Sequence, residues 1–397
     1  MGMAACAAPG SSGFQSPDGG AGAAAAVAVG IPAGPVNHEQ VLRGRQLVLS
    51  RDCGACHGGK LDPGMEGWLV GAPPDAPGAE PPGGGRVWPR NLTPDDETGL
   101  GRVSERQIFN ALRYGLRPTV TPDVTITSAV PGQGNHPEDP SYLAPAMPWL
   151  WWRYMSDQEL WDIAAYLRYG LRPVENHVPP VQTPPDGWAS EFTVEKIGTH
   201  LVPPFPTAHE ELRLPERKDQ VLRGRALVAE AACSACHGGG LDPSREGWLT
   251  GMTSPDQEFQ IGPFKTRPRN LTPDNTTGIG RFSERQLFNA LRYGLRPGET
   301  ADVEITSTVP GEGNHPFHPK YLAPPMPWPA WRHMSDDDLW DIVAYLKHGV
   351  KPVANRVADS EGPPDFWAGE YTPDKIGPYP ASGFPTANER PVRVASP

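Results

Sequence analysis

Apolar residues recur at helical spacing in three short stretches of the first half of the chain. The first covers residues 38–51, the second begins at Ser104 and the third at Ser156. Gln107 and Glu159 follow these serines by three residues, the spacing of a capping box that begins a helix. A glycine then ends each of the two later helices. The pattern therefore predicts helices at 38–51, 104–115 and 156–170, with the same signals again at 283–294 and 335–349.

The rest of the pattern predicts loops. No segment alternates apolar and polar residues clearly enough to indicate a strand. Pro and Gly, 50 and 45 residues, make up close to a quarter of the 397 positions. The 12 Trp residues nevertheless supply apolar surface for cores, so the loops are expected to be ordered. The predicted fold is mainly α-helical with long Pro/Gly-rich loops.

The chain from residue 38 onward consists of two copies of one sequence repeat. Arg90-Asn-Leu-Thr-Pro-Asp95 returns as Arg269-Asn-Leu-Thr-Pro-Asp274, and Phe205-Pro-Thr-Ala208 returns as Phe384-Pro-Thr-Ala387. A period of this length indicates tandem domains and not a solenoid of short repeats. The predicted organisation is a flexible Ala/Gly-rich linker at 1–37, a first domain at 38–215 and a second domain at 216–397.

Two cysteine motifs, Cys53-Gly-Ala-Cys56-His57 and Cys233-Ser-Ala-Cys236-His237, carry the candidate chemistry. Two cysteines at this spacing can each form a thioether with one haem vinyl group, and the adjacent histidine then reaches the iron. A Cys₄ zinc site would leave both histidines unexplained, and a thioredoxin-like pair would need a βαβ context that is absent from the pattern. The sequence therefore predicts two covalently attached c-type haems on Cys53, Cys56, Cys233 and Cys236, with His57 and His237 as iron ligands. The second ring nitrogen of each histidine should donate to a backbone carbonyl, for which residues 61–63 and 241–243 are candidates.

Three repeated pairs could supply the sixth iron ligand: Met147 and Met326, Met155 and Met334, or His136 and His315. The first pair is favoured, because its Pro-rich loops can hold the sulfur without a helix and because Met/His ligation suits an electron carrier. The second pair directly precedes helix N-caps, where a hydrophobic staple is the alternative role. The third pair lies in Asn-His-Pro turns and could bind a haem propionate or close the loop. Further candidates for contact with a haem, with ordinary packing as the alternative, are Arg90, Arg102, Arg113, Trp149, Arg269, Arg281, Arg292 and Trp328.

Charge and the N-terminal segment bear on partners and location. The formal net charge of −11 disfavours nucleic acid as a partner and leaves redox proteins as the expected ones. No apolar run reaches the roughly 18 residues of a membrane-spanning helix. Met3-Ala-Ala-Cys6 resembles a lipobox, although the basic and apolar regions expected before one are missing from residues 1–5. A lipidated Cys6 that anchors the protein to a membrane and a chance cysteine in a low-complexity tail are both left open.

The order of the motifs carries a family resemblance. CxxCH is followed by Asn-Leu-Thr-Pro-Asp, by Thr-Gly-(Leu/Ile)-Gly, by a helix ending Leu-Arg-Tyr-Gly, by Pro-x-Met-Pro and by a helix containing Ala-Tyr-Leu. This order resembles class I cytochrome c domains, and more narrowly the cytochrome c subunits of membrane-bound gluconate and alcohol dehydrogenases. The resemblance covers 38–173 and 218–352 and implies two tandem cytochrome c-like helical domains with Met147 and Met326 as distal ligands. The chain departs from that family in having two haem motifs where three are typical, and in its inserts at 119–142 and 299–321.

Taken together, these features predict a di-haem c-type cytochrome and not a catalytic subunit. It would transfer electrons between a periplasmic or membrane-associated donor and acceptor, alone or within a respiratory or dehydrogenase complex. The alternative is a di-haem peroxidase, which needs one iron with an open position and hence two unlike sites. Because haem is attached in this way outside the bacterial cytoplasm, the expected location is the periplasm or the cell surface.

Overall fold

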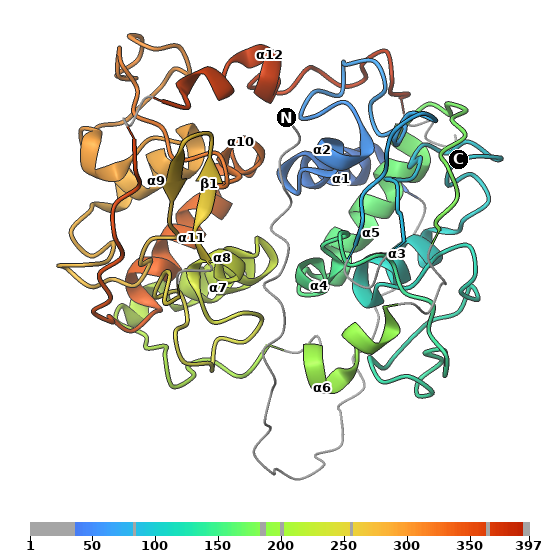
Figure 1. Ribbon diagram of the computed structural model, residues 1–397, viewed down its shortest axis with the longest axis horizontal. Helices are drawn as coiled ribbons and strands as arrows, with labels where there is room; N and C mark the ends of the chain where they lie inside the picture. Colours follow the sequence, from blue (N-terminus) through green and yellow to red (C-terminus); the bar gives the residue numbers. More distant parts are fainter. Residues whose placement is uncertain are drawn as a thin grey trace. The chain divides into compact units, whose positions relative to one another are not determined.

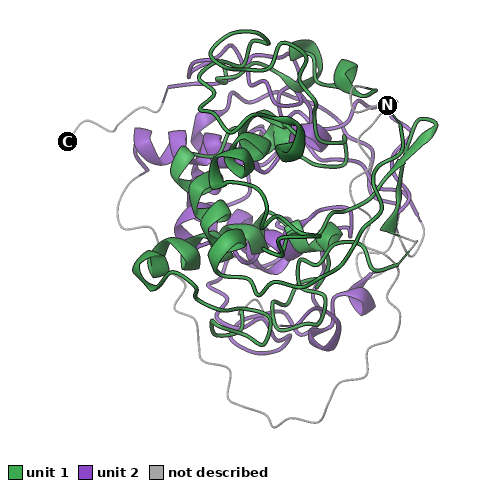
Figure 2. Ribbon diagram, turned by 90° about the vertical axis from the view of Figure 1, so that its left-hand side faces the viewer, with its two compact units in different colours: residues 1–9, 202–381 green, residues 10–201, 382–397 purple. Residues whose placement is uncertain are grey.

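The computed structural model describes residues 36–81, 85–182, 188–198, 202–254, 257–362 and 366–391. These residues form two compact units, shown in purple and green in Figure 2. The N-terminal unit contains residues 36–198 together with 382–391, and the C-terminal unit contains residues 202–381.

Both units are helix-rich, as the sequence predicts, and repeat the same series of helices (Figure 1). The helices of the N-terminal unit are α1 (His38–Ser50), α2 (Cys53–His57), α3 (Glu105–Tyr114), α4 (Trp149–Trp152), α5 (Asp157–Ala165), a π-helical turn (Tyr166–Gly170) and α6 (Val194–Ile197). Those of the C-terminal unit are α7 (Lys218–Glu230), α8 (Cys233–His237), α9 (Glu284–Tyr293), α10 (Trp328–Trp331), α11 (Asp336–His348) and α12 (Pro373–Ile376). Short 3₁₀ turns lie at Ala189–Glu191, Pro215–Arg217, Pro297–Glu299 and Ala368–Glu370.

The predicted capping boxes are present. The hydroxyl of Ser104 accepts from the backbone N–H of Gln107 at 3.1 Å, and the Gln107 side chain accepts from the Ser104 N–H at 3.0 Å. Ser156 and Glu159 form the same reciprocal pair at the start of α5. The predicted starts of α3 and α5 are thus confirmed. The last turn of the third helix differs from the prediction, because α5 ends at Ala165 and continues as the π-helical turn.

A close crossing of the first and third helices forms the centre of each unit. α1 packs along α5, and a Cβ atom at Gly44 would lie 1.9 Å from the carbonyl oxygen of Asp162. Gly224 stands in the same relation to Asp341 in the C-terminal unit, at 1.8 Å. Only glycine permits an approach this close. The glycine of the repeated Val-Leu-Arg-Gly-Arg segment therefore sets the distance between the helices.

The inserts are ordered and bound to the second helix. The side-chain amide of Gln107 donates to the carbonyl oxygens of Pro118 and Thr121 at 2.9 and 2.8 Å, and that of Asn110 donates to Val124 at 3.0 Å. Gln286 and Asn289 make the copies of these bonds in the C-terminal unit. Each insert is thereby fixed to the face of α3 or α9.

One hairpin was not predicted. β1 (Phe259–Ile261) and β2 (Phe264–Thr266) pair antiparallel, with Phe259 opposite Thr266 and Ile261 opposite Phe264. Gly262 begins the two-residue connection at φ 55°. Strands of three residues are too short to give a recognisable alternation, which is why the sequence pattern missed them.

The segments after the third helix do not follow the predicted boundary at residues 215 and 216. Residues 202–213 pack within the C-terminal unit, and residues 382–391 pack within the N-terminal unit. The end of each repeat thus contributes to the other unit. In the part of the chain that is described, no helix combines the length and apolar character needed to cross a membrane.

A carboxylate at the start of α9 generates a prediction about acid stability. Glu284 accepts from His348 Nε2 at 2.6 Å and from Arg217 at 2.8 Å, and these bonds lower the pKa of Glu284 to about 2. A depressed carboxyl pKa stabilises the fold at pH values above the usual 4.5, and this contribution is lost as the pH falls toward 2. Glu284→Gln should therefore lower the Tm at neutral pH and weaken its fall between about pH 5 and 2.5.

Glu105→Gln is the matched control, because Glu105 holds the same position on α3 but accepts from the hydroxyl of Tyr169. The measurement is the Tm by calorimetry over this pH range. Identical pH profiles for the wild type and Glu284→Gln would contradict the prediction.

Candidate haem sites

Each CxxCH motif forms a separate short helix. Asp52 and Ala232, with φ of 54° and 58°, precede α2 and α8, and Gly58 and Gly238, with φ of 101° and 96°, follow them. These left-handed residues break the chain on both sides of the motif. Within the helix, cysteines three residues apart face the same side. The two thiols and the histidine are thereby presented together, as attachment to one haem requires.

The four cysteines of the two motifs form no disulfide with any described residue. They are Cys53, Cys56, Cys233 and Cys236, and burial raises the pKa of the Cys53 thiol to about 12. Among the described residues, no three or more His, Cys, Asp or Glu side chains come together as a metal site. The Cys₄ zinc alternative therefore finds no support. Neutral thiols on one helix face suit thioether formation.

A hydrogen bond fixes each histidine ring. His57 Nδ1 lies 2.7 Å from the carbonyl oxygen of Arg90, and His237 Nδ1 lies 2.6 Å from that of Arg269. Because a carbonyl oxygen can only accept, Nδ1 carries the proton and the Nε2 lone pair is available to a metal. Burial lowers the pKa of both histidines, which keeps the rings neutral. Each ring is therefore prepared as an iron ligand.

The prediction that the histidine rings donate to carbonyls at residues 61–63 and 241–243 was wrong. The acceptor comes from the Arg-Asn-Leu-Thr-Pro-Asp segment, 33 residues beyond His57. The loop after α2 turns back on itself, with the N–H of Gly71 donating to the His57 carbonyl at 2.7 Å and the N–H of Leu92 donating to Leu69 at 2.9 Å. These bonds place Arg90 beside the ring. The signal in the sequence was the repetition of that segment.

Asn91, which sequence reasoning did not single out, positions the accepting carbonyl. Its side chain is 1% exposed. The amide nitrogen donates to the Val174 carbonyl at 2.8 Å, and the amide oxygen accepts from the Thr93 N–H at 3.0 Å. Asn270 repeats both contacts in the C-terminal unit. The asparagine thus joins the His57 carbonyl partner to the segment that follows the third helix.

The favoured distal methionines lie in short turns. The N–H of Met147 donates to the Ala144 carbonyl at 2.9 Å, and the N–H of Leu143 donates to Gly115 at the end of α3 at 2.6 Å. The Met326 loop repeats both bonds. Both side chains are partly buried, and Met326 packs against the core of the C-terminal unit. Assignment of Met147 and Met326 as iron ligands stays a prediction.

The competing candidates have packing partners. Met155 and Met334 are 1% and 4% exposed, and Met334 packs in the same core cluster as Leu339. This is the hydrophobic staple expected just before a helix N-cap. His136 is 4% exposed, with Nδ1 3.2 Å from the Pro137 carbonyl and its ring edge-on to Tyr114. These contacts favour structural roles for both alternative pairs.

The arginine candidates separate into two groups. Arg113 donates to Asp157 at 2.5 Å and to the carbonyl of Arg153, so it ties α3 to α5. Arg117, which the sequence analysis did not single out, lies near Arg90, and burial and then repulsion from Arg90 lower its pKa. Neither Arg90 nor Arg117 has a carboxylate partner among the described residues. Two neighbouring guanidinium groups without an anion fit haem propionates.

The indole of Trp149 is a buried hydrogen-bond donor in the N-terminal unit. Trp149 stacks on Tyr142 with ring centroids 5.8 Å apart, and its buried Nε1–H has no hydrogen-bond partner among the described residues. Buried donors are nearly always paired in native proteins. The indole is therefore in keeping with a bound group that offers an acceptor. Together with the two cysteines and the histidine of the motif, it makes the residues present fit a c-type haem.

The two sites differ in their charged neighbours. Asp52 directly precedes Cys53, and burial raises its pKa to about 7, whereas Ala232 takes this place in the C-terminal unit. Arg269, the copy of Arg90, forms an ion pair with Asp359 at 3.0 Å. The two sites therefore share a frame but not an electrostatic environment.

Comparison with known proteins points to cytochrome c proteins, which agrees with the cysteine and histidine geometry of the two motifs. Residues 221–349 match the cytochrome c family model. The chain is similar to the gluconate 2-dehydrogenase cytochrome c subunit of Pantoea cypripedii, with 27% identity over 84% of this chain and 66% of that protein. It is also similar to the fructose dehydrogenase cytochrome subunit of Gluconobacter japonicus, with 27% identity over 77% of this chain and 52% of the relative. A third relative is the cytochrome c subunit of the quinone-dependent alcohol dehydrogenase of Gluconobacter oxydans, with 26% identity over 77% and 54%.

These matches confirm the resemblance to cytochrome c subunits of gluconate and alcohol dehydrogenases. The chain spans about half to two-thirds of the length of these curated relatives. By their names, these three relatives are the cytochrome subunits of their dehydrogenases.

The role of Asn91 is open to test. Asn91→Ala should destabilise the N-terminal unit by about 1–3 kcal/mol, because the Val174 carbonyl and the Thr93 N–H lose buried partners. It should also loosen the carbonyl that holds His57, so the haem of that unit should lose its histidine at higher pH in an acid titration. Absorption spectra of the holoprotein measure this, and Asn270→Ala should affect the other haem. Unchanged stability and acid titration in both variants would show that the asparagine does not position the carbonyl.

Proposed function

We propose that this chain is an electron-transfer cytochrome made of two tandem cytochrome c-like domains, each with one covalently attached c-type haem. The observation that carries the proposal is the repeated histidine geometry, in which Nδ1 of His57 and of His237 donates to a backbone carbonyl next to the two cysteines of its motif. This arrangement leaves one imidazole nitrogen free in each unit. It is what a proximal ligand of a covalently held haem requires.

The roles of the residues follow from their chemistry. Cys53 and Cys56 would hold the first haem by thioethers, and His57 and Met147 would be the ligands of its iron. Cys233, Cys236, His237 and Met326 would do the same for the second. When bound, the haem iron supplies one-electron redox chemistry. The chain's own part is to keep the ligands in place, since a ring held at Nδ1 cannot rotate away from the iron.

The proposed partners are redox proteins. The similarity to cytochrome subunits of sugar and alcohol dehydrogenases supports a place in such a complex, between an oxidising subunit and a later acceptor. The proposed location is the periplasm or the cell surface, where this type of haem attachment takes place. Attachment to a membrane through a lipidated Cys6 is part of the same proposal, and this cysteine lies outside the described residues.

The number of haems is the first test. Cys53→Ala with Cys56→Ala should remove one haem per chain, and Cys233→Ala with Cys236→Ala should remove the other. The haem content per chain is measured by pyridine haemochrome absorbance and by intact mass. One haem in the wild type, or complete loss of haem in either variant, would contradict two independent attachment sites.

The distal ligands are the second test. Met147→Ala and Met326→Ala should each remove about half of the methionine–iron charge-transfer band at the red edge of the visible spectrum, because each haem contributes one such bond. Met155→Leu and His136→Gln are the controls and should keep the band. Loss of the band in a control but not in Met147→Ala would reassign the ligand. A high-spin fraction with peroxide turnover in the wild type would indicate a peroxidase instead of a carrier.

A further inference from the structure

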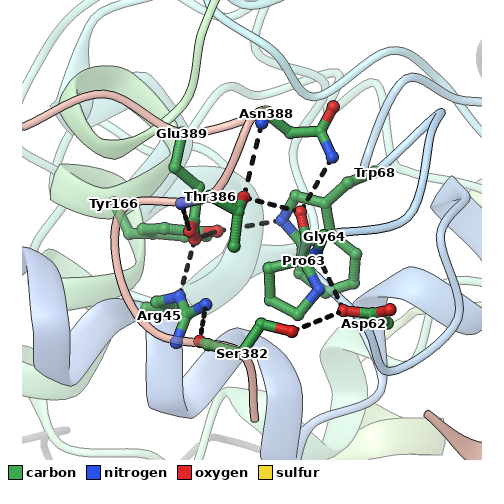
Figure 3. Close-up of polar contacts among 10 residues, drawn as sticks. All are labelled: Arg45, Asp62, Pro63, Gly64, Trp68, Tyr166, Ser382, Thr386, Asn388 and Glu389. Carbon is green, nitrogen blue, oxygen red and sulfur yellow. Dashed lines mark hydrogen bonds and ion pairs between the residues drawn. The ribbon is translucent and has the colours of Figure 1, made fainter. Parts of the chain in front are cut away.

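In the N-terminal unit the end of the chain is bound by Arg45, Pro63 and Tyr166, and the site that these residues form is called the groove below (Figure 3). At its centre the carboxylate of Glu389 is fully buried. One of its oxygens accepts from Arg45 Nε at 2.6 Å and from the hydroxyl of Tyr166, also at 2.6 Å. These bonds join residues 344 and 223 positions apart in sequence. The buried Glu389 carboxylate is therefore paired with the guanidinium group of Arg45 and the hydroxyl group of Tyr166.

The residues around Glu389 are held by side-chain and backbone bonds. Thr386 Oγ1 and Asn388 Nδ2 both donate to the Pro63 carbonyl at 2.8 Å. The N–H of Arg172 donates to the Asn388 carbonyl at 2.9 Å, and the N–H of Arg390 donates to Gly170 at 2.9 Å. Backbone pairing gives affinity and side-chain pockets give specificity, as in peptide recognition by strand addition. The segment is thus bound as a peptide ligand would be.

The C-terminal unit contains the same groove with the same ligand. Glu210 is 1% exposed and accepts from Arg225 at 2.6 Å and from the hydroxyl of Tyr345 at 2.5 Å. Thr207 Oγ1 donates to the Pro243 carbonyl at 2.8 Å. Both ligands read Phe-Pro-Thr-Ala-x-Glu, at residues 205–210 and 384–389. The arginine Nε, tyrosine and threonine bonds to this motif recur in both units, which indicates a recognition site and not chance packing.

The segments that fill the two grooves come from different parts of the chain. Residues 205–210 lie just before α7, so the second groove is filled locally. The corresponding residues before α1, 25–36, contain neither Phe nor an acidic residue. The first groove has no local ligand of this kind, and the far end of the chain fills it.

The groove is coupled to the haem-attachment helix through Tyr166. Its hydroxyl accepts from Trp68 Nε1 at 2.9 Å while donating to Glu389. Trp68 is 1% exposed, and Cβ atoms at Gly54 and Gly59 would lie 2.6 and 2.7 Å from its ring. Gly54 is inside the Cys53–His57 helix. Two hydrogen bonds and one packing contact therefore connect Glu389 to the haem-binding backbone.

The protonation of the tyrosine agrees with this connection. Burial and the neighbouring Glu389 raise the pKa of Tyr166 well above its usual value, so the hydroxyl keeps its proton and can donate. Tyr345, beside Glu210, is raised for the same reasons. The donor that links the tail to the tryptophan is thereby retained over the working pH range.

We propose that residues 382–391 are the ligand of a peptide-binding groove on the first haem domain, and that Glu389 is a positioning residue for its haem. By holding Tyr166 and Trp68, the bound tail fixes the helix that carries Cys53, Cys56 and His57. Glu210 is the positioning residue of the second haem. The part that concerns haem rests on the proposed function, and the part that concerns the groove does not.

The first experiment uses the full-length holoprotein. Glu389→Gln should raise the midpoint potential of one haem, because removal of a buried anion leaves Arg45 unbalanced and disfavours the more positive oxidised iron. Glu210→Gln should raise the potential of the other haem. Glu175→Gln, which changes an exposed carboxylate paired with His177, is the control and should leave both potentials unchanged. Potentials equal to wild type in both groove variants would overturn the positioning role.

The second experiment tests the groove in trans. In a chain that ends at Ala381, the first haem should show a raised potential, and a synthetic peptide of residues 382–391 should restore it with saturation. The same peptide with Glu389→Gln should need at least about tenfold more peptide, since a charge-assisted bond is lost. Titration calorimetry measures the affinity directly. No binding, or equal binding of the two peptides, would refute the groove.

The outcomes also separate this proposal from the previous one. Haem content is measured in the same samples, and its absence in the wild type would end the haem assignment while calorimetry still judges the groove. If the shortened chain does not fold, the midpoint potentials of Glu389→Gln and Glu210→Gln still test the positioning role.

Discussion

Each unit is organised around one hydrogen bond, in which a histidine ring donates to a distant backbone carbonyl. The pairs are His57 with Arg90 and His237 with Arg269. This bond sets the tautomer and the ring plane, and it needs a carbonyl far along the chain to be held still. Asn91 does this by binding the segment after the third helix, while the loop after α2 folds back to bring the two partners together. Much of the irregular chain in each unit can be understood as support for one acceptor atom.

The duplicated frame allows two sites of different character. Asp52, with its pKa raised to about 7, stands beside the first motif, where the second unit has alanine. Arg90 and Arg117 have no carboxylate partner among the described residues, while their counterparts Arg269 and Arg296 pair with Asp359 and Glu299. Charges this close to a redox group alter its potential without any change of ligand. A carrier with two sites of unequal potential can pass electrons in a preferred direction.

The local signals in the sequence were read correctly and the distant ones were not. Capping serines and C-terminal glycines depend on neighbours within a few residues, so Ser104 and Ser156 could be placed without a structure. The carbonyl partner of His57, the role of Asn91 and the partner of Arg45 depend on contacts across 33 to 344 residues. The repeated Arg-Asn-Leu-Thr-Pro-Asp and Phe-Pro-Thr-Ala segments marked the right residues, but repetition alone does not say what they touch. The methionines stay between these cases, since their loops are defined and their iron bonds are a proposal.

The use of the last residues of the chain to complete the first unit has a consequence for biogenesis. A chain is made from its N-terminus, so α1 and the first CxxCH motif leave the ribosome long before Glu389 exists. The second unit holds its own copy of the ligand just ahead of α7 and can close as soon as it emerges. The order of completion is therefore the reverse of the order of synthesis. During that interval Arg45 and Tyr166 lack their carboxylate partner, and the helix that carries Cys53, Cys56 and His57 is at its least constrained.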